Sequence, residues 1–228
     1  MNIQTFHSSS TGNLYRVSDG NTRLLIECGV QMKRIKQDLD FGLSQIAACL
    51  ISHEHKDHSW AAKDMPKAGI DCYMTKGTLD ALELNGHRFH IIEAGKQFRI
   101  GTWEILPFAT IHNAKEPVGF LLVSGTEKLL FATDTQYIRP RFKGMTHIMV
   151  EANYELEALR NSDLSMEVKR NILAGHMNIE TTKEFFRMND MSKVQEIHLL
   201  HLSQNNSNAE LFRDEIMRIS GRPVYIGG

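Results

Sequence analysis

The sequence feature that most constrains the fold is a short ligand-rich loop, His53-Glu54-His55-Lys56-Asp57-His58. It follows the apolar run 46–51, which predicts a buried strand, and it precedes residues 60–64, which predict a short helix. The three imidazoles and the carboxylate of Asp57 within these six positions are costly to bring together unless a cation neutralises them. Imidazole and carboxylate are ordinary ligands of zinc and of harder divalent metals. The loop therefore predicts a metal site, and the alternative is a solvated charged loop.

Length and composition favour one ordinary globular domain. The 228 residues, 42% of them hydrophobic, are enough for a sizeable core. No apolar stretch approaches the roughly 20 residues that span a bilayer, and the first residues lack the basic start and apolar run of a signal peptide. Cys28, Cys49 and Cys72 show no Cys-x-x-Cys spacing, which favours buried free thiols in a reducing compartment. We therefore expect a cytoplasmic protein with no membrane partner.

The charge balance restricts where a phosphate could bind. The formal net charge of -1 gives no global field that would attract a polyanion, so any phosphate-binding surface must be local. This counts mildly against a long nucleic-acid substrate. One basic, aromatic-interleaved segment, residues 137–143, holds Arg139, Arg141 and Lys143. These arginines could grip a phosphate, and the alternative is a solvated turn.

Strand and helix patterns alternate on both sides of the ligand-rich loop. Apolar patterns predict further strands at residues 3–6, 14–17, 24–26, 70–74, 89–92, 98–100, 120–123, 146–150 and 224–226. Helices are predicted at residues 30–39, 76–84, 156–160 and 208–219. A hairpin turn is predicted at Asp19-Gly20-Asn21. This order predicts the α/β class, with sheets packed between helices in an αβ/βα sandwich.

Two more candidate ligands follow apolar runs in the middle of the chain. His112 comes after the run 105–111, and Asp134 after the run 128–133. A carboxylate such as Asp134 can bridge two cations. Taken alone, a histidine at a strand end is more often structural, and an aspartate more often caps a turn or a helix.

Two histidines near the end of the chain complete the set. His176 lies in a Gly-His loop before a helix that Asn178 could cap, and a helix N-terminus is a natural anion site. His201 ends the buried strand predicted at 194–200. His198 lies three positions earlier and projects from the opposite face of that strand. We therefore interpret His198 as structural and His201 as a candidate metal ligand.

The motif His53-x-His55-x-Asp57-His58 resembles the signature of the metallo-β-lactamase superfamily. The residues that follow it, in the order that the superfamily requires, are His112, Asp134, His176 and His201. The resemblance implies a single domain over residues 1–228 with the four-layer αβ/βα sandwich of that fold. Segments 150–152, 175–176 and 201–206 resemble its phosphodiesterase branch, which includes RNase Z and the bacterial YycJ (WalJ)-like proteins. The YycJ-like group matches more closely through its Ser-rich first loop and its His-Leu-Ser-x-x-Asn-Asn segment. Small phage-encoded members of the superfamily also exist.

The resemblance implies a site for two divalent metal ions, zinc or manganese. The first ion would be held by His53, His55, His112 and Asp134. The second ion would be held by Asp57, His58, Asp134 and His201. Asp57 would also orient the attacking water. His176 would face the phosphate and either neutralise an oxygen or protonate the leaving alkoxide.

Several features depart from the family pattern. Glu27 stands where the superfamily usually has an aspartate that steadies the metal loop, so we expect the same supporting role from a longer carboxylate. Asn113 stands where related phosphodiesterases usually have an aspartate. Little more than one hairpin joins His112 to Asp134, so the tRNA-gripping arm of RNase Z is missing. The interval from Asp134 to His201 has room for only two helices and two strands, so the β-CASP cap is missing too.

We therefore expect a metal-dependent hydrolase of phosphodiester bonds, foremost a nuclease acting on DNA or RNA, with Arg139 and Arg141 in contact with substrate. A cyclic-nucleotide phosphodiesterase is the alternative within this class. A glyoxalase-II-like thioesterase or lactonase can use a similar ligand set but has less need of His176. A non-catalytic binding module is disfavoured because every ligand position is filled, and a β-lactamase because those enzymes use no bridging aspartate at the place of Asp134. The family also implies a homodimer.

Overall fold

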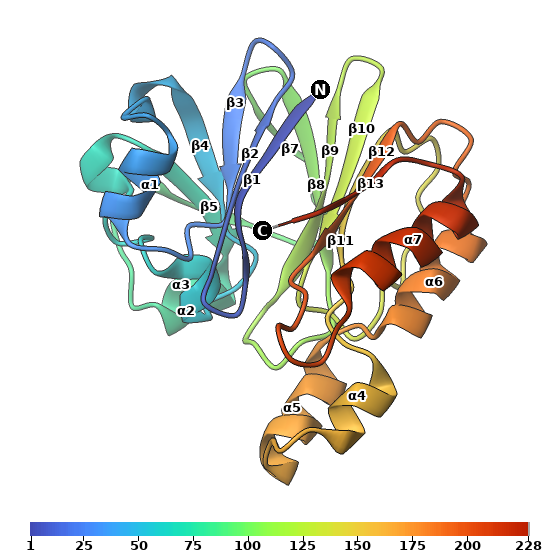
Figure 1. The fold of residues 1–228 in the computed structure, drawn as a ribbon. Coiled ribbons are helices and arrows are strands. Elements are labelled where there is room, and N and C mark those ends of the chain that lie inside the picture. The colour runs from blue at the N-terminus through green and yellow to red at the C-terminus, as the bar shows by residue number, and fades with distance from the viewer. Residues whose placement is uncertain (228) are drawn as a thin grey trace. The chain divides into compact units, whose positions relative to one another are not determined.

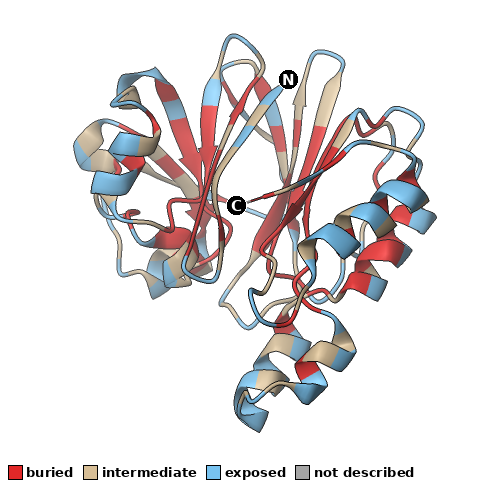
Figure 2. Ribbon diagram, viewed as in Figure 1, coloured by how far each residue is buried: buried red, intermediate tan, exposed pale blue. Residues whose placement is uncertain are grey.

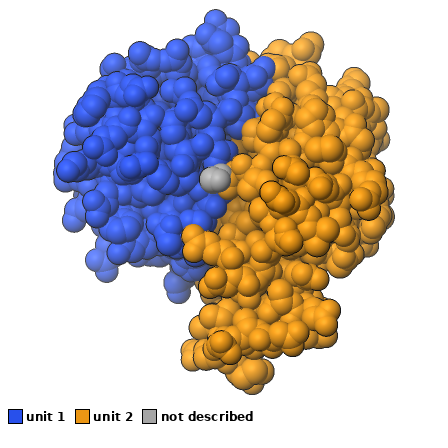
Figure 3. Space-filling view, viewed as in Figure 1, with its two compact units in different colours: residues 1–109, 114–118 blue, residues 110–113, 119–228 orange. Residues whose placement is uncertain are grey.

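The computed structural model describes residues 1–227, which divide into two compact units (Figure 3). The first unit comprises Met1–Ala109 and Ala114–Val118, and the second comprises Thr110–Asn113 and Gly119–Gly228. Each unit combines strands with helices, and the strands belong to two sheets. The predicted α/β class is therefore confirmed, whereas the single domain over the whole chain stays a prediction.

The first unit is built on a sheet with the strand order β1-β2-β3-β4-β5-β6. Its strands are β1 (Asn2–Ser9), β2 (Gly12–Ser18), β3 (Arg23–Ile26), β4 (Ile46–Leu50), β5 (Asp71–Thr75) and β6 (Phe89–Ile92). Strands β1 to β3 pair antiparallel, and β3 to β6 pair parallel. Strands β7 (Phe98–Ile100) and β8 (Trp103–Ala109) form an antiparallel hairpin. The strands expected in this part of the sequence are all present.

Short helices cover one face of this sheet (Figure 1). They are α1 (Met32–Asp38), α2 (Lys56–Ser59) and α3 (Lys76–Ala81), with 3-10 turns η1 (Leu43–Gln45) and η2 (Pro66–Ala68). Figure 2 shows that the buried residues run along the strands. Helix α1 adds Ile35 to a core that also holds the three cysteines, which are free thiols as predicted. Burial of these apolar side chains is the main driving force that fixes the unit.

One helix in this unit was wrongly predicted. The short helix expected at residues 60–64 is instead α2, which begins at Lys56, so Asp57 and His58 lie on a helical turn and not in a loop. Residues 60–64 form turns that follow this helix. The error arose because α2 has only four residues, too few to show helical periodicity in the sequence. Helix α3 also ends at Ala81, three residues earlier than predicted.

Strands of the second unit run in the order β13-β12-β11-β10-β9. They are β9 (Val118–Ser124), β10 (Glu127–Ala132), β11 (His147–Glu151), β12 (Glu196–Leu200) and β13 (Val224–Ile226). Strands β9 and β10 form an antiparallel hairpin, and β10 to β13 pair parallel. This hairpin lies in the interval between His112 and Asp134, in which little more than one hairpin was predicted.

The helices of this unit are α4 (Leu156–Asn161), α5 (Met166–Gly175), α6 (Ile179–Met188) and α7 (Ala209–Ser220). Helices α6 and α7 lie on one face of the strands, and α4 and α5 form a pair beyond the strand ends (Figure 1). Three helices thus lie between Asp134 and His201, one more than predicted. Helix α5 was missed because its apolar residues are largely exposed and its periodicity is weak. No helix within residues 1–227 is long and apolar enough to cross a membrane.

Candidate metal centre

In the first unit, three imidazoles and a carboxylate gather where β4 leads into α2. His53 and His58 are buried, and their ring centroids lie 4.2 Å apart. The ring of His55 lies 4.7 Å from that of His53. The Nε2 atom of His58 is 3.3 Å from Oδ2 of Asp57. The side chains of the predicted motif therefore form one compact set of nitrogen and oxygen donors.

The segment after β3 holds the backbone of this motif. The N–H of Cys28 donates to the carbonyl oxygen of His58 at 2.9 Å, and the carbonyl oxygen of Cys28 accepts from the N–H of Ala61 at 2.9 Å. Beside it, a Cβ atom on Gly29 would lie 1.5 Å from the carbonyl oxygen of Asp57. Only glycine fits here, because a clash with backbone cannot be relieved by a change of rotamer.

Glu27 supports the motif from inside the core. Its side chain is fully buried, and Oε1 lies 3.5 Å from Nδ1 of His58. Oε2 accepts a hydrogen bond of 3.3 Å from the N–H of Ser52, whose hydroxyl oxygen lies 2.8 Å from Nδ1 of His53. The backbone of Glu27 has a φ of 65°, in the left-handed region. The longer side chain thus faces a motif histidine, which is the supporting place expected for Glu27.

Asn13 also contacts the motif, although no residue pattern predicted this contact. It is fully buried, and its Nδ2 donates to the carbonyl oxygen of Asp57 at 3.1 Å and lies 3.2 Å from Nε2 of His58. Its Oδ1 accepts from the hydroxyl group of Tyr15 at 2.9 Å. Asn13 is the second residue of β2, which follows the Ser-rich first loop. The only available signal was the match of that loop to the YycJ-like pattern.

In the second unit, three neighbouring parallel strands end in candidate site residues. Asp134 comes two residues after β10, Glu151 is the last residue of β11, and His201 directly follows β12. The carboxyl ends of parallel strands meet at one edge of a sheet, which is where α/β proteins commonly place their ligands. Distant parts of the sequence are thereby brought to one place.

Two imidazoles flank the carboxylate of Asp134. Oδ2 lies 3.4 Å from Nε2 of His112, and Oδ1 lies 3.6 Å from Nδ1 of His201. These distances exceed the roughly 2.7–2.9 Å of a charge-assisted hydrogen bond. Two donors on one tetrahedral ion, each about 2.1 Å from it, would lie about 3.4 Å apart. The spacing and the donor types therefore fit a divalent metal ion.

The backbone at two of these residues is strained. Asp134 has a φ of 49° and His201 a φ of 53°, in the left-handed region that L-residues disfavour. Such strain costs roughly 1–3 kcal/mol at each residue and concentrates at functional sites. Side-chain hydrogen bonds maintain it, since Thr133 donates to Oδ1 of Asp134 at 2.8 Å and Asn153 donates to the carbonyl oxygen of His201 at 2.7 Å.

His112 is fixed by its contact with the end of α5. Its Nδ1 lies 2.9 Å from the carbonyl oxygen of Gly175, which can only accept, so the proton is on Nδ1 and Nε2 faces Asp134. A Cβ atom on Gly175 would lie 2.6 Å from Nδ1 of His112. The N–H of Ile111 donates to the hydroxyl oxygen of Thr135 at 3.0 Å, which attaches the His112 segment beside Asp134.

Fully buried Glu151 pairs with half-buried His176, a partner that was not predicted from the sequence. Nδ1 of His176 lies 3.0 Å from Oε2 of Glu151, and the other carboxylate oxygen accepts from the N–H of Thr135. Burial raises the pKa of Glu151, and the adjacent His176 partly offsets that rise. Asp134, Glu151, His176 and His201 each offer one donor atom within 4.8 Å of the others, so they could also hold a cation. The role of His176 as a proton donor and not a ligand stays a prediction.

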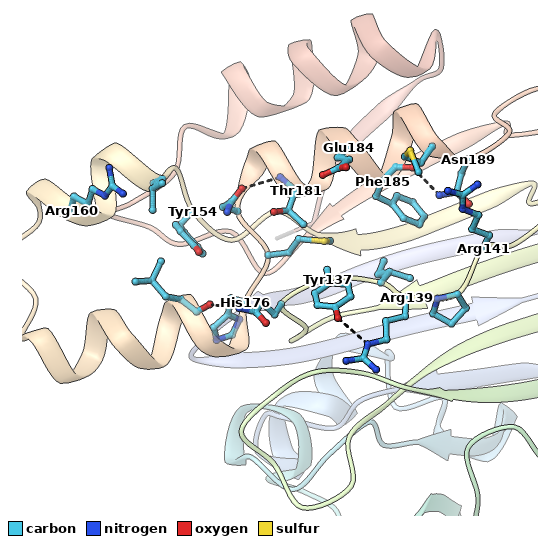
Figure 4. Close-up of a pocket in the computed structure, with 18 residues that line it drawn as sticks. Tyr137, Arg139, Arg141, Tyr154, Arg160, His176, Thr181, Glu184, Phe185 and Asn189 are labelled. Atoms are coloured by element: carbon cyan, nitrogen blue, oxygen red, sulfur yellow. Dashed lines mark hydrogen bonds between the residues drawn. The ribbon is translucent and has the colours of Figure 1, made fainter.

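The predicted basic segment lies beside His176 in the same unit. Arg139, Arg141 and His176 line one cavity of about 920 Å³ (Figure 4). The Nε of Arg139 donates to the hydroxyl oxygen of Tyr137 at 2.9 Å. His198, by contrast, hydrogen-bonds Glu196 and packs against Tyr225, in agreement with its structural interpretation.

The fold and the donor sets define a class of protein. Residues 22–200 match the family model described as the beta-lactamase superfamily domain, which covers most of the chain. The chain therefore belongs to the β-lactamase superfamily. The predicted family is confirmed, and with it the metal-dependent hydrolase that the family implies.

Individual relatives agree with this assignment. The chain is 28% identical over 221 residues to the exodeoxyribonuclease WalJ of Streptococcus pneumoniae serotype 2, covering 90% of this chain and 82% of the relative. It is 26% identical over 234 residues to the exodeoxyribonuclease YycJ of Bacillus anthracis, covering 96% and 89%. The metallo-β-lactamase fold protein YhfI of Bacillus subtilis superposes with a TM-score of 0.76 at 17% identity, covering 98% and 95%. The last likeness confirms the fold.

Proposed function

We propose that this protein is a metal-dependent nuclease that hydrolyses phosphodiester bonds, with DNA as its first substrate. The observation that carries the proposal is the Glu151–His176 pair beside Asp134 and His201, because phosphodiester cleavage needs a positioned acid next to metal-ligand donors. The adjoining arginines, Arg139 and Arg141, suit a phosphate. The relatives named exodeoxyribonucleases support DNA over RNA and an exonucleolytic mode.

The proposed cofactors are two divalent metal ions, zinc or manganese. The proposed ligands, which follow from the family resemblance, are His53, His55, Asp57, His58, His112, Asp134 and His201. When bound, such ions would lower the pKa of water and neutralise charge on the phosphate group.

The other steps belong to side chains of this chain. Asp57 orients the attacking water, and His176 donates a proton to the leaving alkoxide through Nε2. Glu151 holds Nδ1 of His176 at 3.0 Å, which fixes the ring orientation. Arg139 and Arg141 bind non-bridging phosphate oxygens, since guanidinium groups match that geometry.

A substrate panel tests the reaction class. We expect turnover of bis-p-nitrophenyl phosphate and no comparable turnover of a thioester or a lactone. The reverse result would support the glyoxalase-II-like alternative and reject the phosphodiesterase. Single-stranded DNA, duplex DNA, RNA and cyclic mononucleotides, each with Mn²⁺ and with Zn²⁺, then separate a nuclease from a cyclic-nucleotide phosphodiesterase.

Metal analysis tests the cofactor. Purified protein should contain, or take up on addition, at least about one equivalent of transition metal per chain. A chain that neither contains nor binds such a metal would reject the site.

The setting of the reaction is also proposed. The three free, buried cysteines favour a reducing compartment such as the cytoplasm. A homodimer is proposed from the family alone, and sedimentation would test it.

A further inference from the structure

The cavity beside His176 is larger than one phosphate requires. It encloses about 920 Å³ and is lined entirely by residues of the second unit. Its walls come from residues 136–141, both ends of α4, the end of α5 and one side of α6 (Figure 4). Cavities of roughly 300–1,000 Å³ hold organic ligands of the size of a nucleotide.

The lining is locally basic although the chain is not. The lining contains three arginines, Arg139, Arg141 and Arg160, and one carboxylate, that of Glu184, whereas the whole chain has a net charge of -1. Within the described residues, neither Arg141 nor Arg160 has an ion-pair partner. In Figure 4, Arg160 and Arg141 lie towards opposite ends of the cavity, with His176 between them. The charges suit an anionic ligand that extends to either side of His176.

The rest of the wall combines polar side chains, such as those of Gln136 and Thr181, with an apolar and partly aromatic part. This apolar part includes Tyr137, Pro140, Met177, Phe185 and Met188. Tyr137 is 39% exposed and Met188 is 50% exposed, so both present apolar surface to a ligand. A flat aromatic base buries such surface, whereas a free phosphate does not. Phosphate-binding arginines next to an apolar wall therefore favour a nucleotide.

We propose that this cavity binds an unpaired nucleotide of the substrate strand beside the scissile phosphate. The inference rests on the proposed nuclease function. A base in a duplex is stacked on both faces and paired along its edge, so it must leave the helix to enter such a cavity. Cleavage therefore requires a single-stranded or frayed end. Stacking of the base adds binding free energy that does not depend on which base is present, because every base offers an apolar face.

Matched oligonucleotides test this requirement. The substrates are a single strand, a blunt duplex of the same sequence, and a single strand with an abasic analogue at the nucleotide to be released. We expect kcat/KM for the abasic strand to fall roughly 10- to 100-fold, the usual worth of base stacking, and the blunt duplex to be cleaved more slowly than the single strand. Equal rates for the normal and abasic strands would overturn the inference.

A small substrate separates this inference from the function on which it rests. Bis-p-nitrophenyl phosphate has no base, so its metal-dependent turnover reports the hydrolase alone. Turnover of this compound without an abasic effect on DNA overturns the cavity assignment only. No turnover of either substrate overturns the proposed function.

Paired arginine variants test the cavity itself. Arg160→Ala should raise KM for single-stranded DNA about 10-fold, as expected for one lost charged hydrogen bond, and should weaken competitive inhibition by a deoxynucleoside monophosphate. The control is Arg170→Ala, which removes an exposed arginine of α5 that does not line the cavity. Equal changes in both variants would mean a general charge effect and would overturn the assignment, as would no change in Arg160→Ala.

Discussion

The two units supply their candidate ligands in opposite ways. The first takes all of them from six consecutive positions, His53 to His58, where a strand leads into a single helical turn. The second collects His112, Asp134 and His201 from segments up to 89 residues apart in the sequence. A local set is formed largely by chain connectivity, whereas a dispersed set exists only after the parallel strands have paired.

The supporting residues differ accordingly. In the first unit the backbone of the motif rests against Gly29 and is held by Asn13. In the second unit, the ring of His112 hydrogen-bonds the carbonyl oxygen of Gly175. The ligands Asp134 and His201 have strained backbone conformations. The dispersed set should therefore depend more on single side chains, and the local set more on backbone packing.

The largest expected effect follows from Asp134→Ala. Asp134 is the one proposed ligand that both ions share, so its removal leaves two cations without the anion between them. We expect loss of at least one metal equivalent and of all measurable activity, by metal analysis and bis-p-nitrophenyl phosphate assay. An aryl diester with a good leaving group should not rescue the variant, and full metal content would contradict the bridging role.

His176→Ala should have a large effect on rate and little on metal. A positioned proton donor contributes roughly 10²- to 10⁴-fold to kcat, and we expect a loss of that order with both metals retained. A diester with a good leaving group should recover part of the loss, because such a group needs no proton. Metal loss equal to that of His201→Ala would show that the ligand and the acid have been exchanged.

Replacing Gly29 and Gly175 separately by alanine would compare how the ligand sets of the first and second units are held in place. Gly29→Ala places Cβ 1.5 Å from the backbone of Asp57, so we expect displacement of the motif, weaker metal binding and a lower free energy of unfolding. Gly175→Ala places Cβ 2.6 Å from Nδ1 of His112. This side chain can shift, so the loss of metal affinity should be smaller than for Gly29→Ala. Titration with metal and urea unfolding would measure both.

The control for these variants is Gly125→Ala. Gly125 has a φ of 57°, and a Cβ atom added there would have no neighbour within 4 Å, so this variant tests backbone strain without a clash. It should lower stability by about 1 kcal/mol and leave metal affinity unchanged. A change in metal affinity as large as that of Gly29→Ala would contradict the steric explanation.

The smallest effect concerns pH and the second unit. Burial lowers the pKa of His147 and of His198, although Glu196 partly offsets this in both. Their folded pKa values lie below the unfolded value near 6.5, so the unfolded chain binds more protons. The free energy of unfolding should therefore fall as the pH drops below about 6.5. Urea unfolding of metal-free protein at pH 7.5 and 5.5 would measure this.

Replacement of both histidines by glutamine provides the comparison for that measurement. The double variant should show a weaker dependence of stability on pH over the same interval, because two titrating groups are gone. An unchanged dependence would assign it to other groups of the chain.

Much of the fold could be predicted because the strands carry strong local patterns. The buried runs of β3, β4 and β12 are distinct in the sequence, and Asn178 marked the start of α6 by its capping preference. Helix α2 was misplaced because its single turn is held by contacts with Cys28 and Asn13 and not by its own periodicity. Helix α5 was missed because few of its side chains are buried.

The sequence by itself determined the chemistry of the site: which imidazoles and carboxylates are available, and that six adjacent positions hold half of them. Only the tertiary structure decided which buried groups support them. Asn13 reaches the motif across 44 positions, and Glu151 meets His176 across 25. No local pattern encodes such pairs, because a hydrogen bond between distant side chains depends on strand order and register. Those are fixed when the core of each unit is buried.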